Sequence, residues 1–221
     1  MQVAGFLAVC RVTEEQRDRL LELCDGQHIP GWLQQHGSRL PEQLTTLIDH
    51  ESTAVAISYF QAMLVPGILQ TGDYARAVIG RSANVSAEEV EGRVAARLAR
   101  QSLFTRERPA CFTFYLHEFV LRLPVGGTGV MLEQWEHLLR MSLRPYLTLQ
   151  VVPAALGAHA GLTGGFTFME FADFHPVEIK AYQCVLGALA ETALSEGESR
   201  ELIATLATEF SADREDHDDR A

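Results

Sequence analysis

The stretch LTLQVV, residues 147–152, decides the fold class, because its apolar side chains fall on both faces of the strand that it predicts. The stretch GFTFMEF, residues 165–171, has the same character. Strands that are apolar on both faces are typical of a sheet that helices cover on each side. Helical and strand-like segments alternate loosely along the chain, so the sequence predicts an α/β fold, with α+β as the alternative. Its centre is a mixed sheet of roughly five strands covered by helices.

The other strands of the predicted sheet are rich in aromatic and β-branched residues. They are AVAISYF at 54–60, ACFTFYLH at 110–117 and VEIKAYQ at 177–183. Pro66 and Gly67 follow the first of these strands, and a type II turn at this point requires a positive φ at Gly67. The sequence therefore predicts a sharp reversal of the chain there.

Capping residues mark where the helices begin. Thr71 can cap one helix, while Ser86 with Glu89, and Ser195 with Glu198, have the spacing of a capping box. Apolar residues at helical spacing predict a further helix around residues 131–139. Each of these signals places a helix next to a predicted strand.

The chain divides into three predicted parts. Residues 1–50 form an N-terminal helical segment, with one helix from Thr13 and a short one from Pro41 towards Glu51. Residues 51–210 form the α/β domain, which is long enough to bury a substantial core. Residues 211–221, SADREDHDDRA, are acidic and are predicted to be disordered.

Charge and composition exclude several classes of protein. The formal net charge is -11, and Lys180 is the single lysine among 18 basic residues, so an extended surface for nucleic acid is not expected. No apolar run has membrane-spanning length and no signal peptide is recognisable. The four cysteines are scattered, which is typical of buried free thiols. We expect a cytoplasmic protein without direct contact to nucleic acid or membrane.

A first candidate site lies where the strand at 110–117 ends. His117 and Glu118 are adjacent there and Arg122 follows closely. Ligands of α/β proteins bind at the carboxyl ends of strands, so these residues are candidates for a pocket. Adjacent residues of a strand point to opposite faces, so His117 and Glu118 can share a ligand only if the strand ends between them.

A second candidate is the glycine-rich stretch GAHAGLTGG at 157–165, with His159 at its centre. It precedes a strand, whereas dinucleotide and phosphate loops precede a helix, so no nucleotide cofactor is predicted. The stretch serves either as a loop over a pocket or as a plain connection between strands. If the protein is an enzyme, His159 or His117 is its general acid or base.

A third candidate is a basic stripe, since Arg93, Arg97 and Arg100 share one face of the predicted helix. An anionic ligand, an acidic partner or the protein's own carboxylates could meet it. Glu133 and His137 also have helical spacing, but no third ligand accompanies them, so no metal site is predicted.

Five ordered blocks resemble one family of actinobacterial proteins. They are, in chain order, DHESTAVAISYFQAMLVPGILQTGDYARAVI, VEGRVAARLARQSLFTR, LHEFVLRLPVGG, EHLLRMSLRPYLTLQVVP and GAHAGLTGGFTFMEF. This pattern is similar to the domain of unknown function that follows an XRE-type helix-turn-helix in antitoxin-like transcriptional regulators. Residues 1–12 resemble at most the last helix leading out of that helix-turn-helix.

The resemblance implies a regulatory domain that takes a small-molecule ligand or a small acidic protein partner, without DNA-reading helices of its own. The polar positions of the pattern are candidates for the binding pocket: Glu51, Arg97, Gln101, Glu118, Arg122 and His159. The alternative is an enzyme of specialised metabolism that acts on a small organic molecule without metal or cofactor. A homodimer stays open as a further arrangement.

Overall fold

A four-stranded mixed sheet forms the centre of the molecule, in a computed structural model that describes residues 42–172 and 180–218. The strand order is β3-β2-β1-β4. The strands β1, β2 and β3 are parallel, and β4 is antiparallel to β1. Their bounds are Ala56–Gln61 for β1, Cys111–His117 for β2, Leu147–Val152 for β3 and Phe166–Glu170 for β4. The predicted α/β class with a mixed sheet is confirmed.

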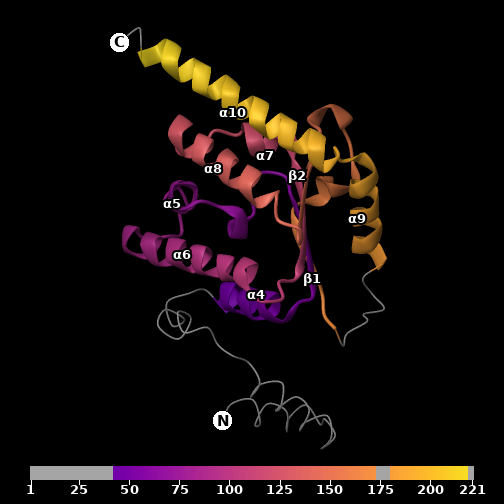
Figure 1. Ribbon diagram of the computed structural model, residues 1–221. Coiled ribbons are helices and arrows are strands. Elements are labelled where there is room, and N and C mark those ends of the chain that lie inside the picture. Colours follow the sequence, from indigo (N-terminus) through magenta and orange to yellow (C-terminus); the bar gives the residue numbers. More distant parts are fainter. Residues whose placement is uncertain (1–41, 173–179, 219–221) are drawn as a thin grey trace, which may run out of the picture. The chain divides into compact units, whose positions relative to one another are not determined.

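Seven α-helices accompany these strands within the described residues. They are α4 (Glu42–Thr53), α5 (Gly72–Ile79), α6 (Ala87–Arg100), α7 (Glu118–Arg122), α8 (Thr128–Met141), α9 (Lys180–Thr192) and α10 (Glu196–Asp218). Short 3-10 helices link them: η2 (Gly67–Leu69), η3 (Gln101–Thr105), η4 (Ala154–Leu156) and η5 (Ala160–Thr163). In Figure 1, α5, α6 and α8 lie on one side of the sheet and α9 lies on the other.

The predicted caps are present at three helix starts. The hydroxyl of Thr71 accepts a hydrogen bond from the Tyr74 amide at the start of α5. At α6 the Glu89 carboxylate accepts from the Ser86 amide over 3.0 Å. At α10 the Glu198 carboxylate accepts from the Ser195 amide over 2.9 Å. These local signals fix where each helix begins, because they satisfy amides that have no partner within the helix.

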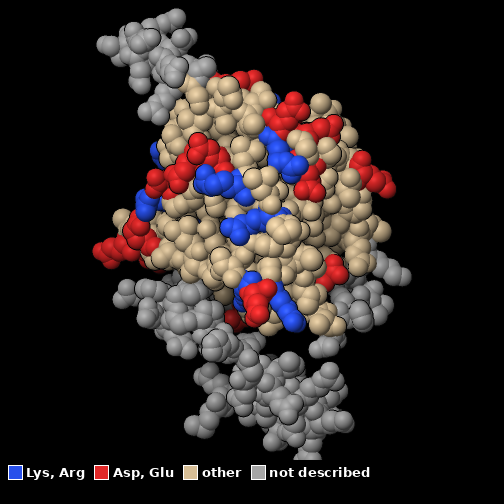
Figure 2. Space-filling model, in the orientation of Figure 1, with Lys and Arg blue, Asp and Glu red and all other residues tan. Residues whose placement is uncertain are grey.

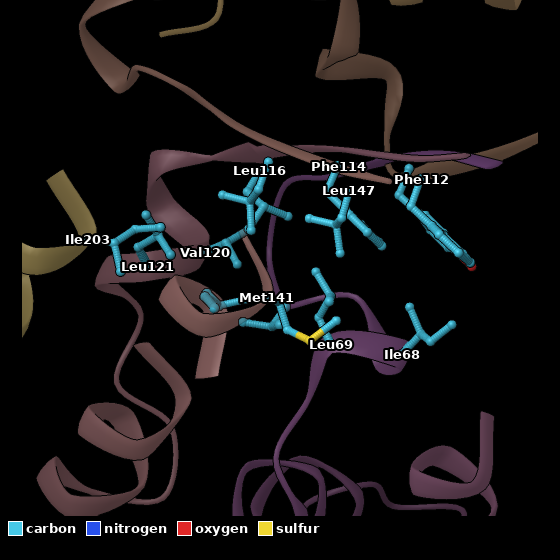
Figure 3. Packing of buried hydrophobic residues seen from close by; sticks show 14 of the residues in the cluster. Ile68, Leu69, Phe112, Phe114, Leu116, Val120, Leu121, Met141, Leu147 and Ile203 are labelled. Carbon is cyan, nitrogen blue, oxygen red and sulfur yellow. The ribbon is translucent and has the colours of Figure 1, made fainter. Parts of the chain in front are cut away.

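The main core lies between the sheet and the layer that contains α5 and α8. One face of the parallel strands supplies Tyr59, Phe114 and Leu149, and the facing layer supplies Leu69 and Trp135, all buried. Figure 3 shows Phe112, Phe114 and Leu116 on one side of this core, with Ile68 and Leu69 opposite them. A smaller core covers the other face of the sheet, where Phe60, Tyr115 and Val152 pack against Leu189 of α9.

The edge strand β3 is covered by the start of α10. The Val151 amide donates to the buried Ser199 hydroxyl over 2.9 Å, and the Val151 carbonyl accepts from the Leu194 amide over 2.8 Å. The Gln150 side chain donates to the Leu194 carbonyl over 2.9 Å. Backbone groups that an edge strand exposes to other chains are therefore used within the molecule.

One predicted strand is wrong in its described part. Residues 180–183 of VEIKAYQ begin the helix α9, and residues 177–179 lie outside the described residues. Val185, Leu186, Leu189 and Ala193 pack together at helical spacing, and burying this stripe against the sheet favours the helix.

Two smaller expectations are also wrong. Gly67 has no positive φ and instead opens η2, at a point where an added Cβ would lie 3.3 Å from Nη1 of Arg100. Cys111 and Cys184 are free as expected, but they are exposed. The helix predicted from Thr13 lies outside the described residues. Among the helices that the structure describes, none combines the length and apolarity needed to cross a bilayer.

Candidate functional site

The carboxyl ends of the three parallel strands meet at one edge of the sheet, where ligands of α/β proteins bind. His117 is the last residue of β2, and Glu118 is the first residue of α7. The strand thus ends between the two residues, which frees them from the alternation that would point them to opposite faces. His159 belongs to the segment that leads from β3 across this edge to β4.

Glu118 ties α7 to the segment after β3. Its carboxylate accepts from the Ala154 amide over 2.9 Å and from Nε of Arg122 over 2.6 Å. The pKa of Glu118 lies below its ordinary value, first because of the Ala154 amide and then because of Arg122 and His117. The carboxylate is therefore engaged as an anion by the protein itself.

His117 and His159 stack on each other, with ring centroids 5.4 Å apart and ring planes 15° apart. Nδ1 of His117 accepts from the Phe119 amide, and Nδ1 of His159 accepts from the Gly161 amide, each over 3.1 Å. A ring nitrogen that accepts a hydrogen bond carries no proton on that atom, so Nε2 is the remaining donor of each ring. Burial, and then the neighbouring His117, hold the pKa of His159 below its ordinary value.

The segment around His159 packs tightly on the end of β1. The His159 ring meets the Phe60 ring edge to face, with centroids 5.7 Å apart. A Cβ added to Gly161 would lie 2.6 Å from the Phe60 ring, so only glycine fits there. Nε2 of His159 is buried without a partner in the described part of the chain.

Glu51 lies in a second cluster, which packs on the opposite face of the sheet. The Glu51 carboxylate accepts from the Tyr59 hydroxyl and pairs with the Arg100 guanidinium, and all three residues are buried. Burial lowers the pKa of Arg100, but the hydrogen bond and charge of Glu51 more than offset this and leave it raised. Burial, followed by the Glu51 charge, raises the pKa of Tyr59.

Arg97 and Gln101 belong to the same second cluster, where both bind Gln70. Nη1 of Arg97 donates to the Gln70 side-chain oxygen, and the Gln101 amide donates to the Gln70 carbonyl over 2.8 Å. The six predicted pocket residues thus fall into two groups. Glu51, Arg97 and Gln101 lie on the face of the main core, whereas Glu118, Arg122 and His159 lie at the carboxyl edge.

A groove of about 580 Å³ lies beside the carboxyl edge, and the sequence did not reveal it. Its lining is mainly apolar: Leu64, Ala77, Val78, Arg81, Pro124, Val125 and Gly126. The chain leaving β1, the end of α5 and the link between α7 and α8 supply these residues. Arg81 is exposed, and its side chain makes no hydrogen bond or ion pair with the described residues. The lining comes from three distant segments, so no sequence motif marks it.

Large apolar side chains are also exposed near the same edge. Met63 follows β1, Phe119 follows β2, Leu156 follows β3 and Leu162 precedes β4. Their exposed fractions are 59%, 43%, 39% and 61%. Because β4 is antiparallel, its start lies beside the end of β1, and all four residues belong to one edge. Exposed apolar residues that gather in one place indicate a contact surface.

No group of three or more metal-ligating side chains occurs in the described ranges 42–172 and 180–218. The predicted pair Glu133 and His137 lies on α8, where Glu133 is exposed and His137 is half-buried.

Comparison with known proteins gives one match. Neither the curated proteins nor the solved structures include a match to this chain. The family described as "Domain of unknown function (DUF5753)" matches residues 44–178, which include the sheet and both clusters of polar residues. Since this match spans more than half of the 221 residues, the chain belongs to that family.

Proposed function

We propose that this chain is a ligand-binding regulatory domain of an XRE-type, antitoxin-like transcriptional regulator from an actinobacterium, acting in the cytoplasm. The five ordered sequence blocks support the regulatory context. The net charge of -11 and the single lysine support a role in binding a ligand instead of nucleic acid.

The groove beside the carboxyl edge is the observation that carries the proposal. Its volume of about 580 Å³ lies within the range of roughly 300–1,000 Å³ that small-molecule sites occupy. Such sites combine a mainly apolar lining with a few polar groups that orient the ligand. Arg81 is the cation of this lining, and its guanidinium is free to bind an anion. The ligand class is therefore a small molecule with an apolar body and one anionic group.

The alternative, an enzyme with His117 or His159 as general acid or base, has less support. Each histidine uses Nδ1 to accept a backbone amide, and Glu118 is held by Ala154 and Arg122. Groups that are engaged in this way stabilise the fold. A general base needs a free acceptor within reach of the proton that it removes.

Anilinonaphthalene sulfonate, an aromatic anion that fluoresces in apolar surroundings, tests the proposal. We expect saturable fluorescence with the intact chain and at least about tenfold weaker binding in Arg81→Glu, because charge reversal repels the sulfonate. Arg140→Glu is the matched control, since Arg140 is exposed on α8 and does not line the groove. Equal binding by wild type and Arg81→Glu, with near-ultraviolet circular dichroism unchanged, contradicts the proposal.

A second candidate function, partner binding, is favoured by the exposed apolar residues Met63, Phe119, Leu156 and Leu162. The partner class is the small acidic protein that the family resemblance implies. We expect the protein of a neighbouring small acidic reading frame to co-purify with the chain. Phe119→Ser combined with Leu162→Ser should abolish the complex, and co-purification at wild-type yield would count against this surface.

A further inference from the structure

The helix α6 carries a half-buried arginine whose charge is not balanced within the described residues. Arg97 donates one hydrogen bond, to the neutral side chain of Gln70, although a guanidinium has five N–H donors. No described carboxylate pairs with it. Burial, followed by the charges of Arg100 and Arg93, lowers the pKa of Arg97. A half-buried cation without a counterion destabilises a protein, and a bound anion would remove this cost.

Arg93 adds a second poorly satisfied guanidinium on the same face, one helical turn away. Its Nε is buried and has no partner in the part of the chain that the structure describes. Its contact with Glu89 is 3.5 Å long, and the Glu89 carboxylate already accepts from the Ser86 amide and hydroxyl. Glu89 therefore offsets the charge of Arg93 only weakly.

The remaining neighbours of Arg97 hold this side chain in place and do not neutralise it. Gln70, which is 2% exposed, receives Arg97 while its own amide donates to the Val65 carbonyl. Arg100 is fully engaged by Glu51, so that carboxylate is not available to Arg97. Gly67 lies beside the same side chain, since a Cβ there would be in ordinary van der Waals contact with Cδ and Nε of Arg97, at 3.8 Å.

Figure 2 shows how basic and acidic side chains are distributed on the face towards the viewer. In Figure 2, basic side chains in the middle of the face towards the viewer are surrounded by uncharged atoms, and many of the acidic ones lie towards its rim. In Figure 1, which has the same orientation, α6 lies on the same side of the sheet as α5 and α8.

We propose that Arg93 and Arg97 form a site for a phosphate-type oxyanion, separate from the apolar groove. Guanidinium groups present planar pairs of N–H donors that match phosphate oxygens, and charge-assisted hydrogen bonds of this kind are among the strongest in proteins. One oxyanion would satisfy the buried Nε of Arg93 and balance the charge of Arg97. The source of the phosphate group is either free inorganic phosphate or the phosphate of a larger metabolite.

Calorimetric titration of the 221-residue chain with inorganic phosphate, at ionic strength held constant with chloride, tests the site. We expect saturable binding that weakens at least about tenfold in Arg97→Gln, because this change removes the positive charge of the guanidinium. Arg93→Gln should weaken binding to a similar degree without touching the contact to Gln70. Arg140→Gln, on α8, is the matched control and should bind like wild type.

Two results would overturn the site. One is the absence of saturable heat with phosphate, and the other is wild-type affinity in Arg93→Gln. The second result decides the matter even if Arg97→Gln fails to fold. Competition by a phosphate monoester at lower concentration than inorganic phosphate would assign the site to a metabolite, and the reverse order would assign it to the free ion. Neither result depends on the apolar groove, because Arg81 is not altered.

Discussion

At the scale of single residues, the buried pair Glu51–Arg100 is the strongest determinant of stability among the ion pairs described. Both side chains are almost without solvent contact, and Tyr59 supplies a further hydrogen bond to the same carboxylate. Removing one partner of a buried pair leaves the other charge uncompensated, which typically costs about 3–5 kcal/mol. The pairs at the surface are screened by solvent and contribute far less.

We expect Glu51→Gln to lower the free energy of unfolding by about 3 kcal/mol or more, because Arg100 then stays buried without its anion. The matched control is Glu91→Gln, since Glu91 pairs with Arg76 at the surface and is 66% exposed. The control should cost less than about 1 kcal/mol. Urea unfolding followed by circular dichroism measures both changes, and similar losses in the two variants would show that burial does not decide the effect.

Contacts between side chains were predictable from the sequence where both partners lie close together along the chain, and not where they lie far apart. The capping pairs Ser86–Glu89 and Ser195–Glu198 were predictable, because both members lie within one helical turn. Glu51 was predicted to line a binding pocket, whereas its ion pair with Arg100, which lies 49 residues further on, was not predicted. The contact between them depends on how the helices pack, which no local pattern encodes.

At the scale of elements, α10 stabilises the sheet by covering its edge strand. Ser199 is the central residue of this contact, because its buried hydroxyl accepts the amide of Val151. Edge strands with unpaired backbone groups are templates for pairing with other chains. The start of α10 therefore protects β3 as well as adding apolar contacts through Ile203 and Leu206.

We expect Ser199→Ala to lower the free energy of unfolding by about 1–3 kcal/mol, because the buried Val151 amide loses its acceptor. Chemical unfolding checks the stability, and light scattering at elevated concentration checks whether the freed edge promotes association. Thr208→Ala is the matched control, since Thr208 is an exposed residue on α10 and its hydroxyl bonds only within the helix. A loss no larger than that of the control would mean that this hydrogen bond contributes little to docking.

Element prediction succeeded where one pattern dominated and failed where two competed. LTLQVV matches β3 residue for residue. Its apolar character indicates a buried strand, and Pro153, which follows directly, agrees with an end of the strand at Val152. VEIKAYQ alternates between apolar and polar residues like a strand. The apolar residues that follow it, from Val185 onwards, instead form a stripe at helical spacing. Burial of that stripe against Phe60 and Tyr115 favours a helix over the short local pattern.

At the scale of the whole molecule, the sequence predicted the mixed sheet but not how it separates the candidate residues. Strand order places β2 between β3 and β1, which brings His117 and the segment around His159 to one edge. The same order leaves Glu51 and Arg97 on the other side of the sheet from His159. Sequence reasoning could not make this division, because the strand pairing that causes it joins segments far apart in the chain.

The stability of the molecule should fall in two steps as the solution is acidified. The pKa values of His159 and His137 lie below the ordinary histidine value of 6.5, in both cases mainly because of burial. A histidine with a lowered folded-state pKa takes up protons more readily when unfolded, so stability declines as the pH falls below 6.5. The Glu118 carboxyl has a pKa below its ordinary value of 4.5. Its ionised form therefore stabilises the fold above pH 4.5, and this contribution is lost as the pH falls below 4.5.

The step that begins as the pH falls below 6.5, the upper step, can be assigned by replacing His159 with asparagine. Asparagine does not titrate, but its side-chain oxygen can still accept the hydrogen bond from the Gly161 amide as a helix cap. We expect the free energy of unfolding of His159→Asn to fall less steeply than that of wild type between pH of about 7.5 and about 5.5. Urea titrations at several pH values measure both slopes. Glu118→Gln is the companion variant, and it should alter only the region below about 4.5 while leaving the upper slope intact. Identical upper slopes in wild type and His159→Asn would mean that protonation of this ring is not coupled to folding. The stacked histidines would then be a packing feature of the carboxyl edge.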